Sequence, residues 1–148
     1  MSGLRRGAIG DLSAVTAVQQ AAYAQNRAIL GVEPLPLLAD YREIFAQSEV
    51  WLADEPEGLG GVLILQPRPE DLLIWSVATA PFARTRGVGN RMLAFAEMRA
   101  RELEVTSIRL YTGEPLTANI AWYTRHGYAH ECLEDMGDRR IVHLIKQL

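Results

Sequence analysis

The spacing of apolar residues changes several times along the chain, and each change predicts a different element. Near the start, four apolar residues recur at the spacing of one helix face: Leu12, Val15, Val18 and Ala22. This spacing predicts an amphipathic helix over 11–26 with Asp11 as its N-cap, after a short strand over 4–9. A second helix is expected over 37–47, because glycine and proline interrupt the pattern before it.

Three short segments rich in large apolar residues follow, over 50–53, 61–65 and 72–78. Turn sequences containing proline or glycine separate them. Since strands joined by tight turns pair with their neighbours, these segments predict a three-stranded antiparallel meander.

The second half of the chain alternates between the two periodicities. Apolar residues share one helix face over 88–103, and every second residue is apolar or β-branched over 105–112. Another helix is predicted over 117–126. Two final strands, over 128–133 and 139–144, complete the series.

The predicted order of elements is β-α-α-β-β-β-α-β-α-β-β, in one domain spanning residues 1–148. A helix crosses from the strand that ends near Ala78 to the strand that starts near Val105, which would make this pair parallel. The expected fold class is therefore α/β, of the α+β type, with a mostly antiparallel sheet and a central parallel strand pair.

Composition and charge narrow the possible functions. The 148 residues are 49% hydrophobic, and 15 Lys+Arg against 18 Asp+Glu give a net charge of −3. These values fit one globular domain and argue against broad binding to nucleic acid. The single cysteine, Cys132, cannot form an internal disulfide, and no metal site is expected. The longest apolar run, from Leu59 to Leu65, is too short to cross a membrane, so a cytoplasmic protein without a membrane partner is expected.

The segment Arg84-Thr85-Arg86-Gly87-Val88-Gly89-Asn90-Arg91 lies between a predicted strand and a predicted helix. Its two glycines let the backbone approach a ligand closely, and the unpaired N–H groups of a helix start carry partial positive charge. The segment therefore predicts an anion site for a pyrophosphate, with Arg84, Arg86 or Arg91 supplying charge. A glycine-rich connection with solvated arginines is the alternative. The P-loop pattern and the third glycine of the dinucleotide fingerprint are both missing.

Three segments resemble the GNAT N-acetyltransferase family. Residues 84–89 match the family loop [Q/R]-x-x-G-x-[G/A], and residues 76–81 resemble the strand that precedes that loop. Residues 119–128 look like the family segment N-x-A-x-Y-x-x-x-G-[F/Y]. The order of elements also agrees with the family along nearly the whole chain.

The resemblance implies that acetyl-CoA binds in a gap between the two central parallel strands. Backbone groups of Val77 and Ala78 would then pair with the pantetheine arm as an added strand does. Asn119 resembles the asparagine that contacts this arm, and Tyr123 resembles the tyrosine that points at the thioester sulfur. The pyrophosphate would be held by the N–H groups of five consecutive residues: Arg86, Gly87, Val88, Gly89 and Asn90.

The activity implied by the resemblance is transfer of an acetyl group to a primary amine of a small molecule or protein, by direct attack in a ternary complex. Tyr123 is the candidate proton donor to the leaving thiolate, and a backbone N–H near Val77 or Ala78 the candidate donor to the carbonyl oxygen. A tyrosine packed between helix and sheet is the alternative for Tyr123.

The sequence does not identify the general base. Three carboxylates are candidates, each with a solvated surface acid as the alternative interpretation: Glu43, Asp71 and Glu114. Cys132, with His130 two residues away, could accept the acetyl group in a two-step route, which the resemblance does not favour. Arg139-Arg140 is interpreted as a solvated turn of the last hairpin, with a phosphate patch as the alternative.

Two other functions remain as alternatives: a non-catalytic module that senses acyl-CoA, and a toxin-like transferase that acetylates aminoacyl-tRNA. The net negative charge disfavours the second, because tRNA is a large polyanion. The same charge favours a cationic acceptor such as a polyamine. The late strands are also expected to be able to pair across a homodimer.

Overall fold

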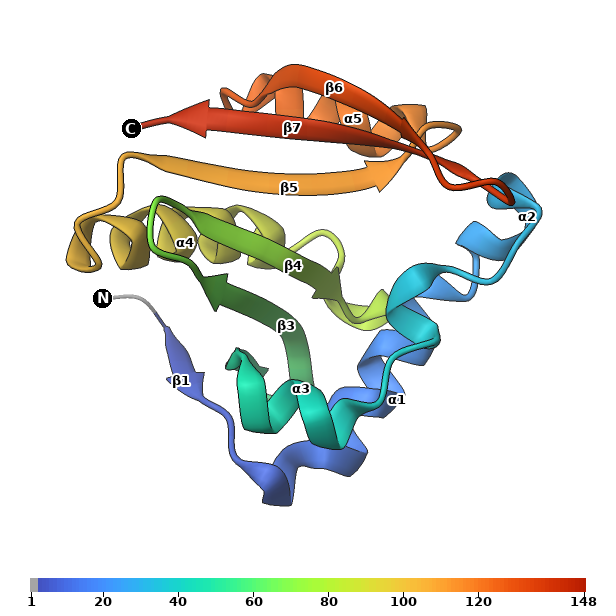
Figure 1. Cartoon of the computed structure of the whole chain (residues 1–148). Helices are drawn as coiled ribbons and strands as arrows, with labels where there is room; N and C mark the ends of the chain where they lie inside the picture. Colours follow the sequence, from blue (N-terminus) through green and yellow to red (C-terminus); the bar gives the residue numbers. More distant parts are fainter. Residues whose placement is uncertain (1–2) are drawn as a thin grey trace.

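The computed structural model describes residues 3–148, so residues 1 and 2 of the predicted domain lie outside the described part. The described residues form one mixed sheet of seven strands in the order β1-β2-β3-β4-β5-β7-β6 (Figure 1). The strands are β1 (Leu4–Arg6), β2 (Glu49–Glu55), β3 (Gly58–Pro67), β4 (Leu72–Thr79), β5 (Ser107–Gly113), β6 (Ala129–Asp135) and β7 (Arg140–Gln147). The helices are α1 (Leu12–Tyr23), α2 (Asn26–Leu30), α3 (Tyr41–Gln47), α4 (Val88–Glu102) and α5 (Thr117–Arg125), with 3-10 turns η1 (Ile9–Asp11), η2 (Leu35–Leu37) and η3 (Pro81–Ala83).

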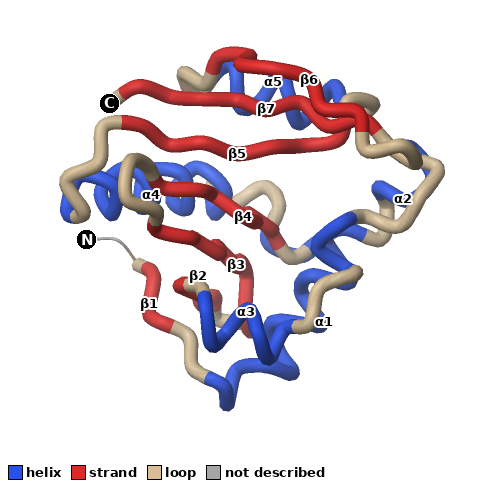
Figure 2. Tube along the Cα trace, viewed as in Figure 1, coloured by secondary structure: helices blue, strands red, loops and turns tan. Residues whose placement is uncertain are grey.

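Helices cover both faces of the β2–β3–β4 meander, which is antiparallel as predicted. Alternate residues of β3 face two different cores. Leu63 and Leu65 pack in the cluster that contains α4, whereas Val62 and Ile64 pack in the cluster that contains α1 and α3. Burial on both faces explains why this strand is a continuous apolar run in the sequence. Figure 2 shows the same layers, with α1 and α3 on the opposite side of the sheet from α4.

The predicted parallel pair is confirmed, and it is short. β4 and β5 pair only from Leu72 with Ile108 to Ile74 with Leu110, although both strands continue further. The separation begins at a β-bulge, because Ile74 and Ser76 lie opposite consecutive residues of β3 and leave Trp75 unpaired. Since bulges bend and twist a strand, β4 turns away from β5 at this point (Figure 1).

The N-terminal region differs from the prediction in its helix boundaries. Asp11 is not a side-chain N-cap of α1, because η1 precedes that helix and the Asp11 carboxylate accepts the Ala8 N–H at 3.0 Å instead. The predicted helix over 11–26 is divided into α1 and α2. The predicted helix over 37–47 begins only at Tyr41, after Asp40 caps it by accepting the Arg42 N–H at 2.9 Å. Three helices therefore stand where the sequence predicted two.

Candidate active site

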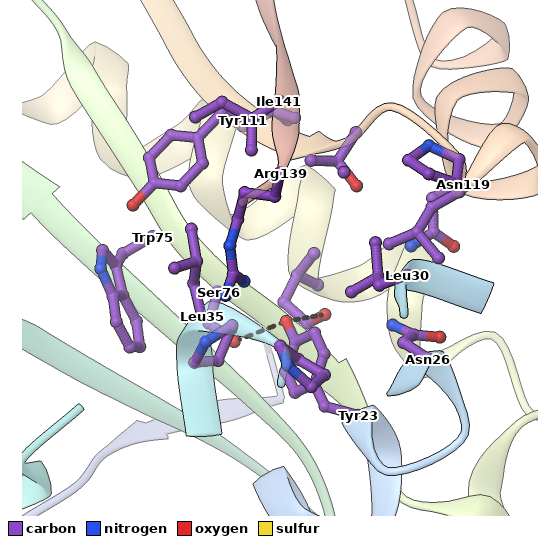
Figure 3. A pocket seen from close by; sticks show the side chains of 18 of the residues that line it. Tyr23, Asn26, Leu30, Leu35, Trp75, Ser76, Tyr111, Asn119, Arg139 and Ile141 are labelled. Carbon is purple, nitrogen blue, oxygen red and sulfur yellow. Dashed lines mark hydrogen bonds between the residues drawn. The ribbon is translucent and has the colours of Figure 1, made fainter. Parts of the chain in front are cut away.

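A cavity of about 480 Å³ opens where β4 and β5 separate. It is lined by residues of α1, α2 and the segment after it, β4, β5, α5 and the start of β7, which are far apart in the sequence. Figure 3 shows that Asn119 on α5 lies at one side of this space, with Trp75 and Tyr111 at the other. The cavity therefore joins three of the predicted residues, Val77, Asn119 and Tyr123, to a second group that the sequence did not single out. Ala78 and the predicted pyrophosphate loop do not line it.

Tyr123 lines this cavity and is also part of the core, with only 9% of its surface exposed. Its ring centroid lies 5.0 Å from that of Trp122 and 5.8 Å from that of Tyr128. Burial raises the pKa of the Tyr123 hydroxyl well above its ordinary value, and the neighbouring Tyr23 and Tyr128 raise it further. The hydroxyl is therefore protonated at neutral pH and able to donate.

The glycine-rich segment leads directly into α4. Gly87 precedes the helix with φ of +74°, a left-handed conformation that glycine adopts without strain. The first helical hydrogen bond runs from the Arg91 N–H to the Gly87 carbonyl at 3.1 Å, so the N–H groups of residues 88–90 have no carbonyl within the helix. The Arg86 N–H, in contrast, donates to the Ala83 carbonyl at 3.2 Å.

The start of α4 is in contact with α5, so the two motif segments meet in space. A Cβ atom on Gly89 would lie 3.1 Å from the Trp122 ring, which means that a larger residue would push the two helices apart. His126 adds a second link, because its Nε2 lies 3.1 Å from Asn90 Oδ1 and its Nδ1 lies 2.8 Å from the Trp122 carbonyl.

The arginines of the segment differ in how their charge is compensated. Arg86 pairs with the Glu57 carboxylate, with Nη1 at 2.6 Å, and Arg91 pairs with Glu55 at 2.9 Å. The Arg86 guanidinium lowers the pKa of Glu57. Arg84 is exposed and forms no ion pair with any residue that the structure describes. Its charge is thus the one most available to an anion at the start of α4.

Two side chains of α1 form hydrogen bonds with the bulged part of β4. The Tyr23 hydroxyl lies 2.8 Å from Ser76 Oγ (Figure 3). It also donates to the Val77 carbonyl at 3.4 Å. Gln19 Nε2 donates to the same Ser76 Oγ at 3.0 Å. The Val77 carbonyl is therefore directed out of the β3–β4 ladder. Because successive residues of a strand turn their backbone groups to opposite edges, those of Ala78 face β3.

The three candidate bases do not line the cavity. Asp71, which is 4% exposed, accepts from Arg68 at 2.5 Å and from Arg109 at 2.7 Å. The hydrogen bond from Arg68, and then that from Arg109, lowers the Asp71 pKa against the opposing effect of burial. Glu114 pairs with Arg140 at 3.4 Å, and Glu43 lies on α3. Among residues 3–148, no carboxylate side chain lines the cavity.

The cysteine route has no support in the geometry. Cys132 is exposed on β6, outside the residues that line the cavity. A bulge between His130 and Cys132 interrupts the register, so the alternation that would place both side chains on one face is broken. The part of the chain that the structure describes also contains no group of three His, Cys, Asp or Glu side chains able to hold a metal ion.

Arg139 differs most from its interpretation as part of a solvated turn. Its side chain is only 9% exposed and points into the cavity between Trp75, Tyr111 and Leu35 (Figure 3). Arg140 fits that interpretation better, with a side chain that is 52% exposed. The pairing of β7 between β5 and β6 places Arg139 here, a long-range contact that local sequence does not indicate.

No described helix is long and apolar enough to span a bilayer.

Comparisons with known proteins agree with this geometry. No curated protein matches the sequence. The S18-alanine N-acetyltransferase of Escherichia coli is 15% identical with a TM-score of 0.79, covering 97% of this chain and 92% of that one. The PaiA N-acetyltransferase of Thermoplasma acidophilum, in complex with coenzyme A, is 17% identical with a TM-score of 0.77 and 98% coverage of both chains. A GNAT acetyltransferase of Elizabethkingia anophelis with acetyl-CoA bound is 16% identical with a TM-score of 0.75, covering 98% of this chain and 97% of that one. These likenesses establish the fold, and residues 15–128 match the Acetyltransferase (GNAT) family, to which this chain therefore belongs.

Proposed function

We propose that this protein is an acetyl-CoA-dependent N-acetyltransferase that acts on a primary amine of a small molecule or protein by direct attack in a ternary complex. The observation that carries the proposal is the position of Tyr123. Its buried, protonated hydroxyl group belongs to a residue that lines the cavity where β4 and β5 separate, on the same helix face as Asn119.

The residues around the opening fit acetyl-CoA. The backbone of Val77 faces away from β3, where its N–H could pair with the pantetheine arm while its carbonyl already accepts from Tyr23, and Ala78 holds the other edge of β4 against β3. Asn119 lines the same cavity and would contact the arm. The pyrophosphate would accept from the N–H groups of 87–90 at the start of α4, with Arg84 adding positive charge. Arg86 would contribute less, because its N–H and its guanidinium already have protein partners.

Bound acetyl-CoA supplies a thioester whose sulfur leaves as the amine attacks. Tyr123 donates its proton toward that sulfur as negative charge develops there. The low polarity that raises the pKa of the phenol also raises that of a buried thiol, which makes the departing thiolate more basic and favours its protonation. Because no carboxylate lines the cavity in the described chain, the amine must arrive neutral or lose its proton to water.

The proposal is tested by thermal unfolding with acetyl-CoA, with ATP and NAD as controls that share the adenine and phosphates. A ligand at about 100 times its Kd adds about 2.7 kcal/mol, which raises the Tm by several degrees for a domain of this size. We expect this shift with acetyl-CoA alone, followed by release of free thiol when a suitable amine is added. An equal shift with ATP would reduce the site to a general anion site.

The cytoplasmic location and the homodimer stay predictions. A module that binds acyl-CoA without turnover is the competing outcome, and it would show the thermal shift without thiol release.

A further inference from the structure

The side of the cavity away from Asn119 has walls that are mostly apolar. Leu35, Trp75 and Tyr111 surround it, and Tyr23 lies below them (Figure 3). Such a surface fits an aliphatic or aromatic body rather than a strongly hydrated one. If acetyl-CoA enters along Val77 and Asn119, this side is the space left for the amine acceptor.

One charged side chain is buried in these walls. Arg139 donates from Nη1 to the Glu33 carbonyl at 2.7 Å, and from Nε and Nη2 to the Asp138 carboxylate at 3.2 and 3.1 Å. These bonds use three of the five N–H groups of a guanidinium, which leaves one on each terminal nitrogen. Each of these remaining N–H groups can donate to an oxygen of a carboxylate.

Arg139 has its counter-charge outside the cavity. Its partner Asp138 has a side chain that is 60% exposed and does not line the cavity. Arg140 also lines the cavity and is paired with Glu114. Within the described residues, the lining thus carries two guanidinium groups and no carboxylate. A cationic acceptor such as a polyamine would meet like charge here, which opposes the expectation drawn from net charge.

From this geometry we propose that the acceptor is an amine with a carboxylate on a largely apolar body, and that Arg139 binds the carboxylate. This inference rests on the proposed function. The inference adds the substrate class to that function. Arg139 determines this class, because a carboxylate side chain at the same position would select a positively charged acceptor instead.

The competing role for Arg139 is purely structural. Its bond to the Glu33 carbonyl ties the segment between α2 and η2 to the start of β7, across the cavity. Loss of that tie alone would impair all acceptors equally. A carboxylate-binding role predicts a loss that depends on whether the acceptor carries a carboxylate, so matched acceptors separate the two.

The probes are two amino acids and their neutral amides, phenylalanine with phenylalaninamide and methionine with methioninamide, and spermidine as the cationic comparison. The readout is kcat/KM for thiol release from acetyl-CoA at one pH. Each acid-to-amide ratio is then compared between proteins, so that differences in amine pKa cancel. The variants are Arg139→Met, Arg139→Lys and, as a control with the same change in charge, Arg101→Met on the exposed face of α4.

We expect Arg139→Met to lower the acid-to-amide ratio by about 10- to 100-fold, mainly through KM, as loss of a charged hydrogen-bonded pair does. Arg139→Lys should restore part of it, and Arg101→Met should leave it unchanged. A ratio that Arg139→Met does not change would overturn the inference in favour of the structural tie. Turnover of the amides or spermidine but of neither acid, or of none of these amines, would also overturn it. Absence of acetyl-CoA binding is a different result, because it contradicts the proposed function itself.

Discussion

At the cofactor end of the site, the start of α4 and the helix α5 that packs on it supply backbone N–H groups and residues from two short sequence segments. Of these, Asn119 and Tyr123 line the cavity, and no residue of α4 does. At the Trp75 end, the cavity is bounded by side chains that come from α1, the segment after α2, β4, β5 and the start of β7. The first end depends on N–H groups at a helix start and on glycines that allow close packing, and therefore suits a ligand common to a family. The second depends on side-chain identity, which can change without altering the fold. The difference indicates that cofactor binding and acceptor choice are separable by mutation.

The largest expected effect is at the point where the two ends meet. Tyr123→Phe removes the proton donor and keeps the ring that packs against Trp122 and Tyr128. We expect kcat to fall by about 10²- to 10⁴-fold with little change in acetyl-CoA affinity or Tm. Steady-state kinetics with thermal shifts would check this. A kcat within a few-fold of wild type would assign Tyr123 to packing alone.

The pH dependence tests the inference that no carboxylate of the described chain acts as a base in the cavity. Below the pKa of the acceptor amine, kcat/KM should rise about tenfold per pH unit, because only the neutral amine attacks. The raised pKa of Tyr123 means that its hydroxyl loses its proton only at higher pH than an ordinary tyrosine, so no fall is expected up to about pH 10. Two acceptors with different amine pKa values should give two different profiles. One shared inflection between pH 5 and 7 would indicate a protein base instead.

Asp71, which lies outside the cavity, offers a second test of whether a protein carboxylate acts as the general base. Its pKa is lowered in the folded state, so its contribution to stability is present above its unfolded pKa and is lost as the pH falls through the folded value. Asp71→Asn should lower the free energy of unfolding by about 2 kcal/mol at pH 7 and reduce this acid dependence, while kcat stays near wild type. A large loss of kcat in folded protein would instead make Asp71 the base.

The smallest expected effect concerns the arginines near the start of α4. Arg84→Gln should weaken acetyl-CoA binding by a few-fold, roughly what an exposed charge contributes, and the loss should shrink at high salt. Arg86→Gln is the matched control, because Arg86 is already paired with Glu57. Titrations at two salt concentrations would show the larger loss in Arg84→Gln. Equal or reversed losses would contradict the assignment of charge at this end.

Most of the fold was predictable because its signals are local. The apolar run of β3 and the alternating pattern of β5 each predicted the correct element, and the crossover helix predicted the parallel pair. The division of the first long helix was missed, since residues 11–26 carry no helix-breaking glycine or proline. Asp11 does stand at the N-cap position of α1, but its carboxylate bonds back to the Ala8 N–H rather than to the helix, which local sequence does not distinguish.

The cofactor end of the site and the Trp75 end of the cavity also differed in how far the sequence predicted them. Gly87 and Gly89 at the start of α4, and Asn119 and Tyr123 in the cavity, lie in compact motifs, so the sequence could suggest them together. Arg139 could not be found this way, because its environment is set by pairing of β7 with strands distant in the chain.

The central claim is tested most directly by mass spectrometry of a reaction that contains the protein, acetyl-CoA and a panel of small amines and peptides with free N-termini. The account predicts an N-acetylated product formed in equal amount to free coenzyme A by the wild-type protein, and its near absence with Tyr123→Phe. Binding of acetyl-CoA without any acetylated product across the panel would contradict it, and would identify the chain as an acyl-CoA-binding module.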